Sequence, residues 1–139
     1  MKRTVLLAVS TAAIAALALP AGAAPPKPIT KEFTYTDGTP DATATAASGV
    51  GCDGALPNEP GIEFTAPAAG KLKVSITHTG DWALEVHDPK GRVLGAADGG
   101  GPNDQEMVSV KLKAGGTYVI LPCNIGALPE AKGKIEYKP

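Results

Sequence analysis

The sequence predicts an all-β fold, an antiparallel β-sandwich of jelly-roll type with about seven or eight short strands. Apolar side chains stand at every second position in two neighbouring runs: Leu72, Val74 and Ile76 in the first, and Trp82, Leu84 and Val86 in the second. Turn residues interrupt the chain roughly every eight to twelve residues, as in sandwich proteins. Strands with one apolar face need a second layer over that face, so two packed sheets are expected.

The remaining strands are expected wherever a short run alternates or is almost wholly apolar. The expected strands are residues 32–36, 61–66, 71–77, 82–87, 92–95, 107–113, 117–122 and 132–137, with a further short strand at 43–47. Thr79-Gly80-Asp81 predicts a hairpin turn between the two central runs, and Asp88-Pro89-Lys90-Gly91 predicts a turn into the next strand. The nearly continuous apolar run 117–122 is typical of a strand that is buried on both faces.

The N-terminal residues 1–23 have the pattern of a secretory signal peptide. Lys2 and Arg3 precede an apolar run at 5–19, and Ala21-Gly22-Ala23 offers a cleavage site. The run is short for a membrane span, so an uncleaved anchor is the weaker alternative. We therefore expect a secreted chain, extracellular or periplasmic, with a flexible lead-in at 24–31 and a single sandwich domain at 32–139.

Charge and composition exclude some classes of partner. The chain has 13 basic and 14 acidic residues, for a net charge of −1. Its lysines are spread along the sequence, and the balance becomes more acidic once Lys2 and Arg3 are removed. This pattern predicts no binding of nucleic acid and no attachment to a membrane after signal cleavage. We expect a monomer.

Two cysteines, Cys52 and Cys123, remain in a chain that is expected to be exported. An oxidising compartment favours a disulfide between them. The alternative, a pair of metal-binding thiols, needs further ligands at suitable spacing, and none flanks either cysteine.

Three segments resemble the bacterial pre-peptidase C-terminal domain family. They are Pro-Gly-Ile-Glu-Phe-Thr-Ala-Pro-Ala-Ala-Gly-Lys-Leu-Lys-Val at 60–74, Leu-Glu-Val-His-Asp-Pro-Lys-Gly at 84–91 and Lys-Ala-Gly-Gly-Thr-Tyr-Val-Ile at 113–120. The resemblance covers about residues 59–137 and implies a jelly-roll-like sandwich that aids secretion, localisation or substrate attachment of exported enzymes. This chain departs from the family at Ala83, where an Asp is common.

The sequence contains no catalytic constellation, so we do not expect an enzyme. A nucleophilic hydrolase needs a Ser or Cys beside an activating base, and no G-x-S-x-G motif is present. The serines lie in a loop or on the polar faces of expected strands, and both cysteines are explained by pairing.

Two groups of side chains are candidate metal ligands. Asp98, Asn103, Asp104 and Glu106 are the densest group of oxygen ligands and would suit calcium; otherwise they are a solvated loop. His78 and His87 each end a strand and, with Asp81 or Asp88, would make a weak zinc site. The alternative is that both histidines are simply exposed near turns.

Trp82, His78 and His87 are also possible ligand contacts, although alternation places Trp82 in the core. The function expected is a non-catalytic binding or accessory module with a cell-envelope, polysaccharide or protein partner. The alternatives are a small inhibitor of hydrolases that acts through the Cys52 loop at 49–60, a calcium-dependent adhesion module, and an envelope-surface protein without a specific ligand.

Overall fold

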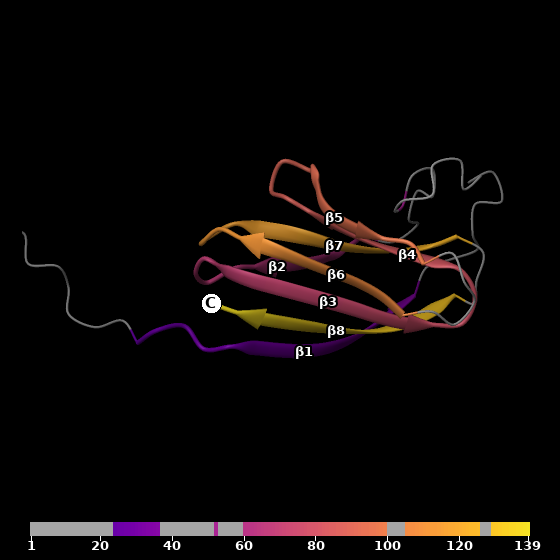
Figure 1. Cartoon of the computed structure of the whole chain (residues 1–139), viewed down its shortest axis with the longest axis horizontal. Helices are drawn as coiled ribbons and strands as arrows, with labels where there is room; N and C mark the ends of the chain where they lie inside the picture. The colour runs from indigo at the N-terminus through magenta and orange to yellow at the C-terminus, as the bar shows by residue number, and fades with distance from the viewer. Residues whose placement is uncertain (1–23, 37–51, 53–59, 100–104, 126–128) are drawn as a thin grey trace, which may run out of the picture.

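A computed structural model describes residues 24–36, 52, 60–99, 105–125 and 129–139 as two antiparallel sheets packed face to face (Figure 1). Sheet A has the strand order β1-β8-β3-β6, and sheet B has the order β2-β7-β4-β5. This arrangement of eight strands in two four-stranded sheets is the jelly roll, which confirms the predicted fold class. Within the described ranges, no helix is long and apolar enough to cross a membrane.

The strand bounds follow the sequence expectation closely. Sheet A contains β1 (Ile29–Thr36), β8 (Glu130–Lys138), β3 (Gly70–His78) and β6 (Gln105–Leu112). Sheet B contains β2 (Ile62–Thr65), β7 (Thr117–Asn124), β4 (Trp82–His87) and β5 (Val93–Ala97). β1 begins at Ile29, so the last residues of the expected lead-in pair with β8. The expected strand at 43–47 lies outside the described residues.

The core lies between the sheets and is built by strand alternation. In β6 every second residue is buried, and the alternating apolar runs of β3 and β4 point inward from opposite sheets. The largest fully buried side chains are Trp82 and Tyr137. The Tyr137 hydroxyl donates to the carbonyl oxygen of Ala68 at 2.6 Å, so its burial leaves no unpaired polar group.

The two central runs do not form the hairpin that the sequence suggested. β3 pairs with β6 and β8 in sheet A, whereas β4 pairs with β5 and β7 in sheet B. The connection crosses from one sheet to the other through Gly80, which has a φ of 96°. Alternation shows which face of a strand is apolar but not which strand lies beside it, because facing strands of two sheets share the same pattern.

The expected turn after β4 is present. The backbone N–H of Gly91 donates to the carbonyl oxygen of Asp88 at 2.9 Å, and Gly91 has a φ of 77°. The Asp88 carboxylate accepts the N–H groups of Lys90 and Arg92, at 2.8 and 3.0 Å, and pairs with the Arg92 guanidinium at 2.6 Å. The backbone N–H and the side chain of Arg92 together lower the pKa of Asp88 to about 2.

The expected disulfide joins Cys52 to Cys123 of β7, with the two Cα atoms 5.7 Å apart. Both cysteines lie on the outer side of sheet B, where they pack with the buried Ala83. The backbone N–H of Cys52 also donates to the Glu85 carboxylate at 2.8 Å. A segment distant in sequence is therefore fixed to sheet B by one covalent bond and one hydrogen bond.

Candidate functional site

The outer face of sheet A is a regular grid of polar side chains. The strand registers place outward residues in four cross-strand rows: Lys138, Lys71 and Lys111; Thr30, Glu136, Lys73 and Ser109; Glu32, Lys134, Ser75 and Met107; and Thr34, Lys132, Thr77 and Gln105. Neighbours within a row are about 4.8 Å apart, and successive rows are about 7 Å apart. Strand pairing therefore fixes the position of the Cα atom that carries each of these side chains.

This face is strongly basic although the whole chain is slightly acidic. We call it the lysine face; its six lysines are Lys71, Lys73, Lys111, Lys132, Lys134 and Lys138. Only Glu32 and Glu136 carry negative charge in the same rows, so the rows have a net charge of about +4 at neutral pH. The full sequence has a net charge of −1, so the lysine face concentrates positive charge.

Glu136 organises the centre of the lysine face. Its carboxylate accepts a hydrogen bond from the Lys134 ammonium at 3.1 Å and lies 4.0 Å from the Lys73 ammonium. The hydrogen bond from Lys134, with the charges of Lys134, Lys73 and Lys138, lowers the pKa of Glu136. The other four lysines form no ion pair with any carboxylate of the described residues: Lys71, Lys111, Lys132 and Lys138.

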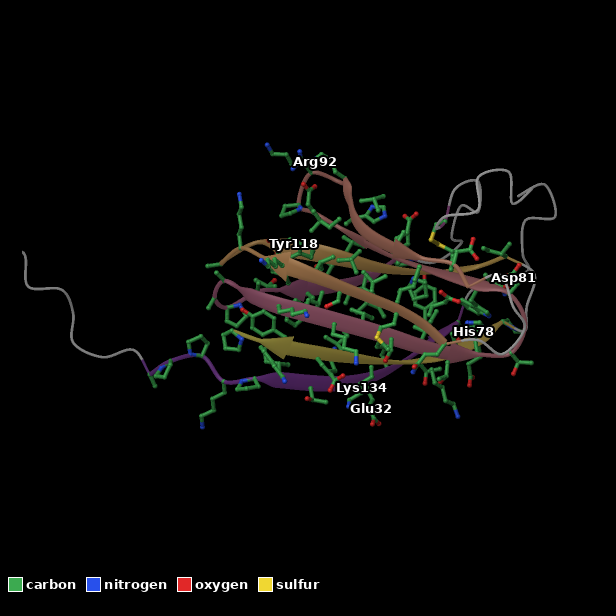
Figure 2. All side chains as sticks on the ribbon, viewed as in Figure 1. Glu32, His78, Asp81, Arg92, Tyr118 and Lys134 are labelled. Carbon is green, nitrogen blue, oxygen red and sulfur yellow. A yellow bond between two sulfur atoms is a disulfide. The ribbon has the colours of Figure 1, made fainter. Side chains whose placement is uncertain are left out.

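A shallow hollow of about 530 Å³ crosses all four strands of the lysine face. It is lined by Glu32, Phe33, Thr34, Ser75, Thr77, Gln105, Lys132, Gly133 and Lys134. Figure 2 shows Glu32 and Lys134 together at β1 and β8. Two further hollows, of about 380 and 210 Å³, lie beside it at Thr79 and at Lys71, so the depression runs along the strands.

The hollow presents mainly donors and acceptors, and Phe33 is the one aromatic residue in its lining. Ammonium groups, the Ser75 hydroxyl and the amide of Gln105 point outward. The Thr77 hydroxyl is also on this face, where it donates to the carbonyl oxygen of Lys132 at 3.3 Å and can still accept a hydrogen bond. The outward rows contain no aromatic residue, and the ring of Phe33 packs against the core over Gly133. Such a surface is suited to binding a polar or anionic ligand by hydrogen bonds and charge.

The outer face of sheet B carries a different polar pair. The Glu85 carboxylate, in a residue only 6% exposed, lies 2.6 Å from Nε2 of His87. Its other oxygen accepts the N–H of Cys52. In the described part of the chain no serine or threonine hydroxyl bonds to His87, and Cys52 and Cys123 are in the disulfide. This geometry indicates that the Glu85 carboxylate holds the backbone of Cys52 against sheet B.

The candidate calcium ligands are only partly described. Asn103 and Asp104 lie outside the described residues. Glu106 is buried at 3% exposure, where its carboxylate accepts the N–H of Gly99 at 2.9 Å, and Asp98 is half-buried. No three His, Cys, Asp or Glu side chains of the described ranges gather closely enough to hold a metal ion. The calcium site therefore remains a prediction.

The structure does not bring the two histidines together. The His78 side chain is fully buried inside the sandwich, with Nδ1 3.0 Å from the Gly80 carbonyl oxygen and Nε2 3.9 Å from the Glu106 carboxylate. His87 lies on the outer side of sheet B, beside Glu85. Asp81 and Asp88 join neither histidine in a metal-binding group among the described residues.

Trp82 is also fully buried, 6.4 Å from His78 between ring centroids. Its ring belongs to the core, as its alternation with Leu84 and Val86 predicts. Neither the Trp82 ring nor the His78 side chain reaches solvent, although His78 belongs to the lining of the hollow at Thr79. Their role as ligand contacts stays a prediction. Figure 2 shows His78 at the end of the sandwich, near Asp81.

The lysine face was missed by sequence reasoning, which treated scattered lysines as ordinary solvated surface. The signal was present as lysines at alternate positions within two segments, Lys71 and Lys73 in one and Lys132 and Lys134 in the other. It becomes a surface only because β3 and β8 are neighbours in sheet A. Strand pairing across the chain, which alternation does not reveal, gathers the charges.

Known proteins offer a distant structural likeness. No family model and no curated protein sequence matches the chain. The GH26-CBM35 β-(1,4)-mannanase of Podospora anserina is similar at a TM-score of 0.42 and 19% identity, over 81% of this chain and 28% of that protein. The chain thus corresponds to less than a third of the mannanase.

Two smaller structures are similar over nearly their whole length. A family 35 carbohydrate-binding module from Clostridium thermocellum has a TM-score of 0.41 and 12% identity, over 79% of this chain and 98% of the module. The C-terminal family 6 module of a Zobellia galactanivorans laminarinase has a TM-score of 0.35 and 15% identity, over 78% of this chain and 100% of the module. At such identities and TM-scores the likeness assigns no ligand to the chain.

Proposed function

We propose that this protein is an exported, non-catalytic binding module whose lysine face holds a polysaccharide. The observation that carries the proposal is the hollow of about 530 Å³ across all four strands of sheet A. Its lining is rich in hydroxyl, amide and ammonium groups, which are the groups that hydrogen-bond to sugar hydroxyls and ring substituents. A depression without deep walls accepts a polymer that continues beyond it in both directions.

The sheet supports the proposal because it holds the binding groups in place before the ligand arrives. Ser75 and Thr77 project from β3, which has a hydrogen-bonded strand on either side. A ligand that meets fixed donors loses less affinity to ordering the protein than one that meets a mobile loop. β3 is nine residues long, so the face extends about 30 Å along the strands, enough for several sugar units.

Export is part of the proposal and is supported by the N-terminal sequence pattern and by the disulfide. A Cys52–Cys123 bond persists in an oxidising compartment, where extracellular polysaccharides are also found. The module would then attach itself, or a protein associated with it, to such a polymer.

The test is affinity electrophoresis of the purified protein in gels that contain soluble polysaccharides, neutral and acidic. We expect retardation by at least one polymer. Ser75→Ala combined with Thr77→Ala should weaken that binding about fivefold or more, since two hydrogen bonds are lost. The matched control removes two hydroxyls from the outer face of sheet B, Thr65→Ala with Thr117→Ala, and should leave retardation unchanged.

Failure of every polysaccharide to retard the protein would overturn the proposed function. Loss of binding in the sheet B control, with the Ser75 and Thr77 variant unaffected, would move the site to the other face.

A further inference from the structure

The charge of the lysine face specifies the class of polysaccharide. Resting on the proposed function, we infer that the ligand is an acidic polysaccharide, with carboxylate groups along its chain. A neutral polymer needs only the hydroxyl and amide groups of the hollow. It gives no role to lysines gathered on one face of a chain whose net charge is −1.

The four lysines that form no ion pair with a carboxylate of the described residues lie at opposite ends of the lysine face. Lys71, Lys111 and Lys138 share the first row, and Lys132 stands in the last row beside Thr77. These rows are about 20 Å apart along β3. A polymer lying along β3 would therefore meet free ammonium groups at both ends of its path and hydroxyl groups between them.

The central lysines are held differently from the outer ones. Lys134 donates to Glu136, and Lys73 lies on the other side of the same carboxylate. The Glu136 carboxylate is charged at neutral pH, as glutamate ordinarily is, and it therefore offsets part of the charge of these two lysines. The strongest attraction for an anion is thus displaced to the two ends, which favours an extended polymer over a compact anion.

The side-chain types favour a polysaccharide over other polyanions. Single-stranded nucleic acids are bound by basic grooves with aromatic rings for base stacking, and the outward rows contain no aromatic residue and no arginine. Attachment at a membrane interface needs apolar side chains that enter the lipid, and Met107 is the only large apolar residue in these rows. Hydroxyls interleaved with ammonium groups suit uronic acids, which carry both hydroxyl and carboxylate groups.

The ligand test uses polymers that differ only in charge. We would titrate the protein calorimetrically with polygalacturonate, alginate and hyaluronate, each beside its methyl-esterified form. The acid form of at least one should bind about tenfold more tightly than its ester. The difference should shrink as salt is raised from about 0.05 to 0.5 M, because exposed charges are screened over a shorter distance.

The protein test removes two of the free lysines. Lys71→Gln with Lys138→Gln, a cross-strand pair, should weaken binding of the acid form about tenfold and leave the ester unaffected. The control, Lys90→Gln, removes a lysine charge from the exposed turn after β4 of sheet B and should change neither affinity.

The outcomes separate the two proposals. Equal affinity for acid and ester forms, or binding of neutral polysaccharides alone, would overturn the acidic ligand and leave the binding module standing. Absence of binding to every polysaccharide would overturn both. Binding of oligo-dT as tightly as the best acidic polymer, at equal charge concentration, would show a general polyanion site and also overturn the inference.

Discussion

The two outer faces of the sandwich have opposite characters although the sheets that carry them are built alike. The outer side of sheet A is exposed and rich in lysine. The outer side of sheet B buries Ala83 and Cys123 completely and leaves Cys52 8% and Glu85 6% exposed. A jelly roll needs only its inner faces for the shared core, so each outer face is free to take another role. Here one face is cross-linked and buried around the disulfide, and the other is exposed to solvent.

Removing the disulfide is the strongest way to break this contrast, because it releases Cys52 from sheet B. Its two cysteines are 71 residues apart, so the chain-entropy model gives a loss of about 4 kcal/mol for Cys52→Ala with Cys123→Ala. Guanidinium unfolding of the variant and of the wild type, each with and without reductant, measures the change.

The control for the disulfide variant is ligand binding below its melting temperature. Sheet A contains neither cysteine, so binding to the lysine face should persist while the free energy of unfolding falls. An unchanged unfolding midpoint would show that the cross-link does not stabilise the outer face of sheet B.

Replacing Glu85 tests how much its hydrogen bonds, apart from the disulfide, stabilise the outer face of sheet B. Glu85→Ala leaves the buried N–H of Cys52 without its acceptor and separates His87 from its partner. We expect a loss of about 2 kcal/mol in the free energy of unfolding, measured with urea. Glu63→Ala, at an exposed position on the same sheet, is the matched control and should change stability little.

A double-mutant cycle with the disulfide variant sharpens this test. If Glu85 acts by holding Cys52, its replacement should cost clearly less once the disulfide is absent, since the two changes share a partner. Full additivity would contradict that role and make Glu85 important for another reason.

The sequence predicted the strands well because alternation is a local property. Leu72, Val74 and Ile76 establish one apolar face without reference to any other segment, and the structure confirms that strand and its bounds to within a residue. The turn at Gly91 was predicted for the same reason, since its positive φ is a property of one residue. The Cys52–Cys123 pairing followed because the sequence contains only these two cysteines.

What the sequence did not reveal depends on which strands are neighbours. Alternation does not show that β3 lies beside β8. For this reason the sequence suggested a hairpin between β3 and β4, and it did not reveal the lysine face. Lys71 and Lys138 meet only through that pairing. The burial of the His78 and Trp82 side chains likewise depends on how the sheets pack at one end.

Asp88 gives sheet B a contribution to stability that depends on pH. Its pKa is about 2 in the folded protein and about 4 in an unfolded chain, so protonation favours unfolding. The contribution is fully present above about pH 5 and is lost as the pH falls towards 2. In Asp88→Asn the amide oxygen still accepts the turn N–H groups, but the ion pair with Arg92 is absent.

The measurement is thermal unfolding of wild type and Asp88→Asn between about pH 2 and 7. The wild type should be the more stable protein at neutral pH, and the difference should shrink on acidification. A difference that stays constant over this range would show that the pKa of Asp88 is not lowered in the folded protein.

Glu136 offers the smallest and most selective change, on the lysine face. Glu136→Gln removes a carboxylate that competes with an anionic ligand for Lys134 and Lys73, while keeping the size of the side chain. Exposed ion pairs of this kind contribute about 0.2–1 kcal/mol, so an acidic polysaccharide should bind about two- to fivefold more tightly. Glu63→Gln makes the same change in net charge on sheet B and should leave the affinity unaltered. Tighter binding in both variants would reflect net charge alone. Tighter binding in Glu136→Gln alone would place the anion beside Lys134 and Lys73, because the lost carboxylate frees their ammonium groups.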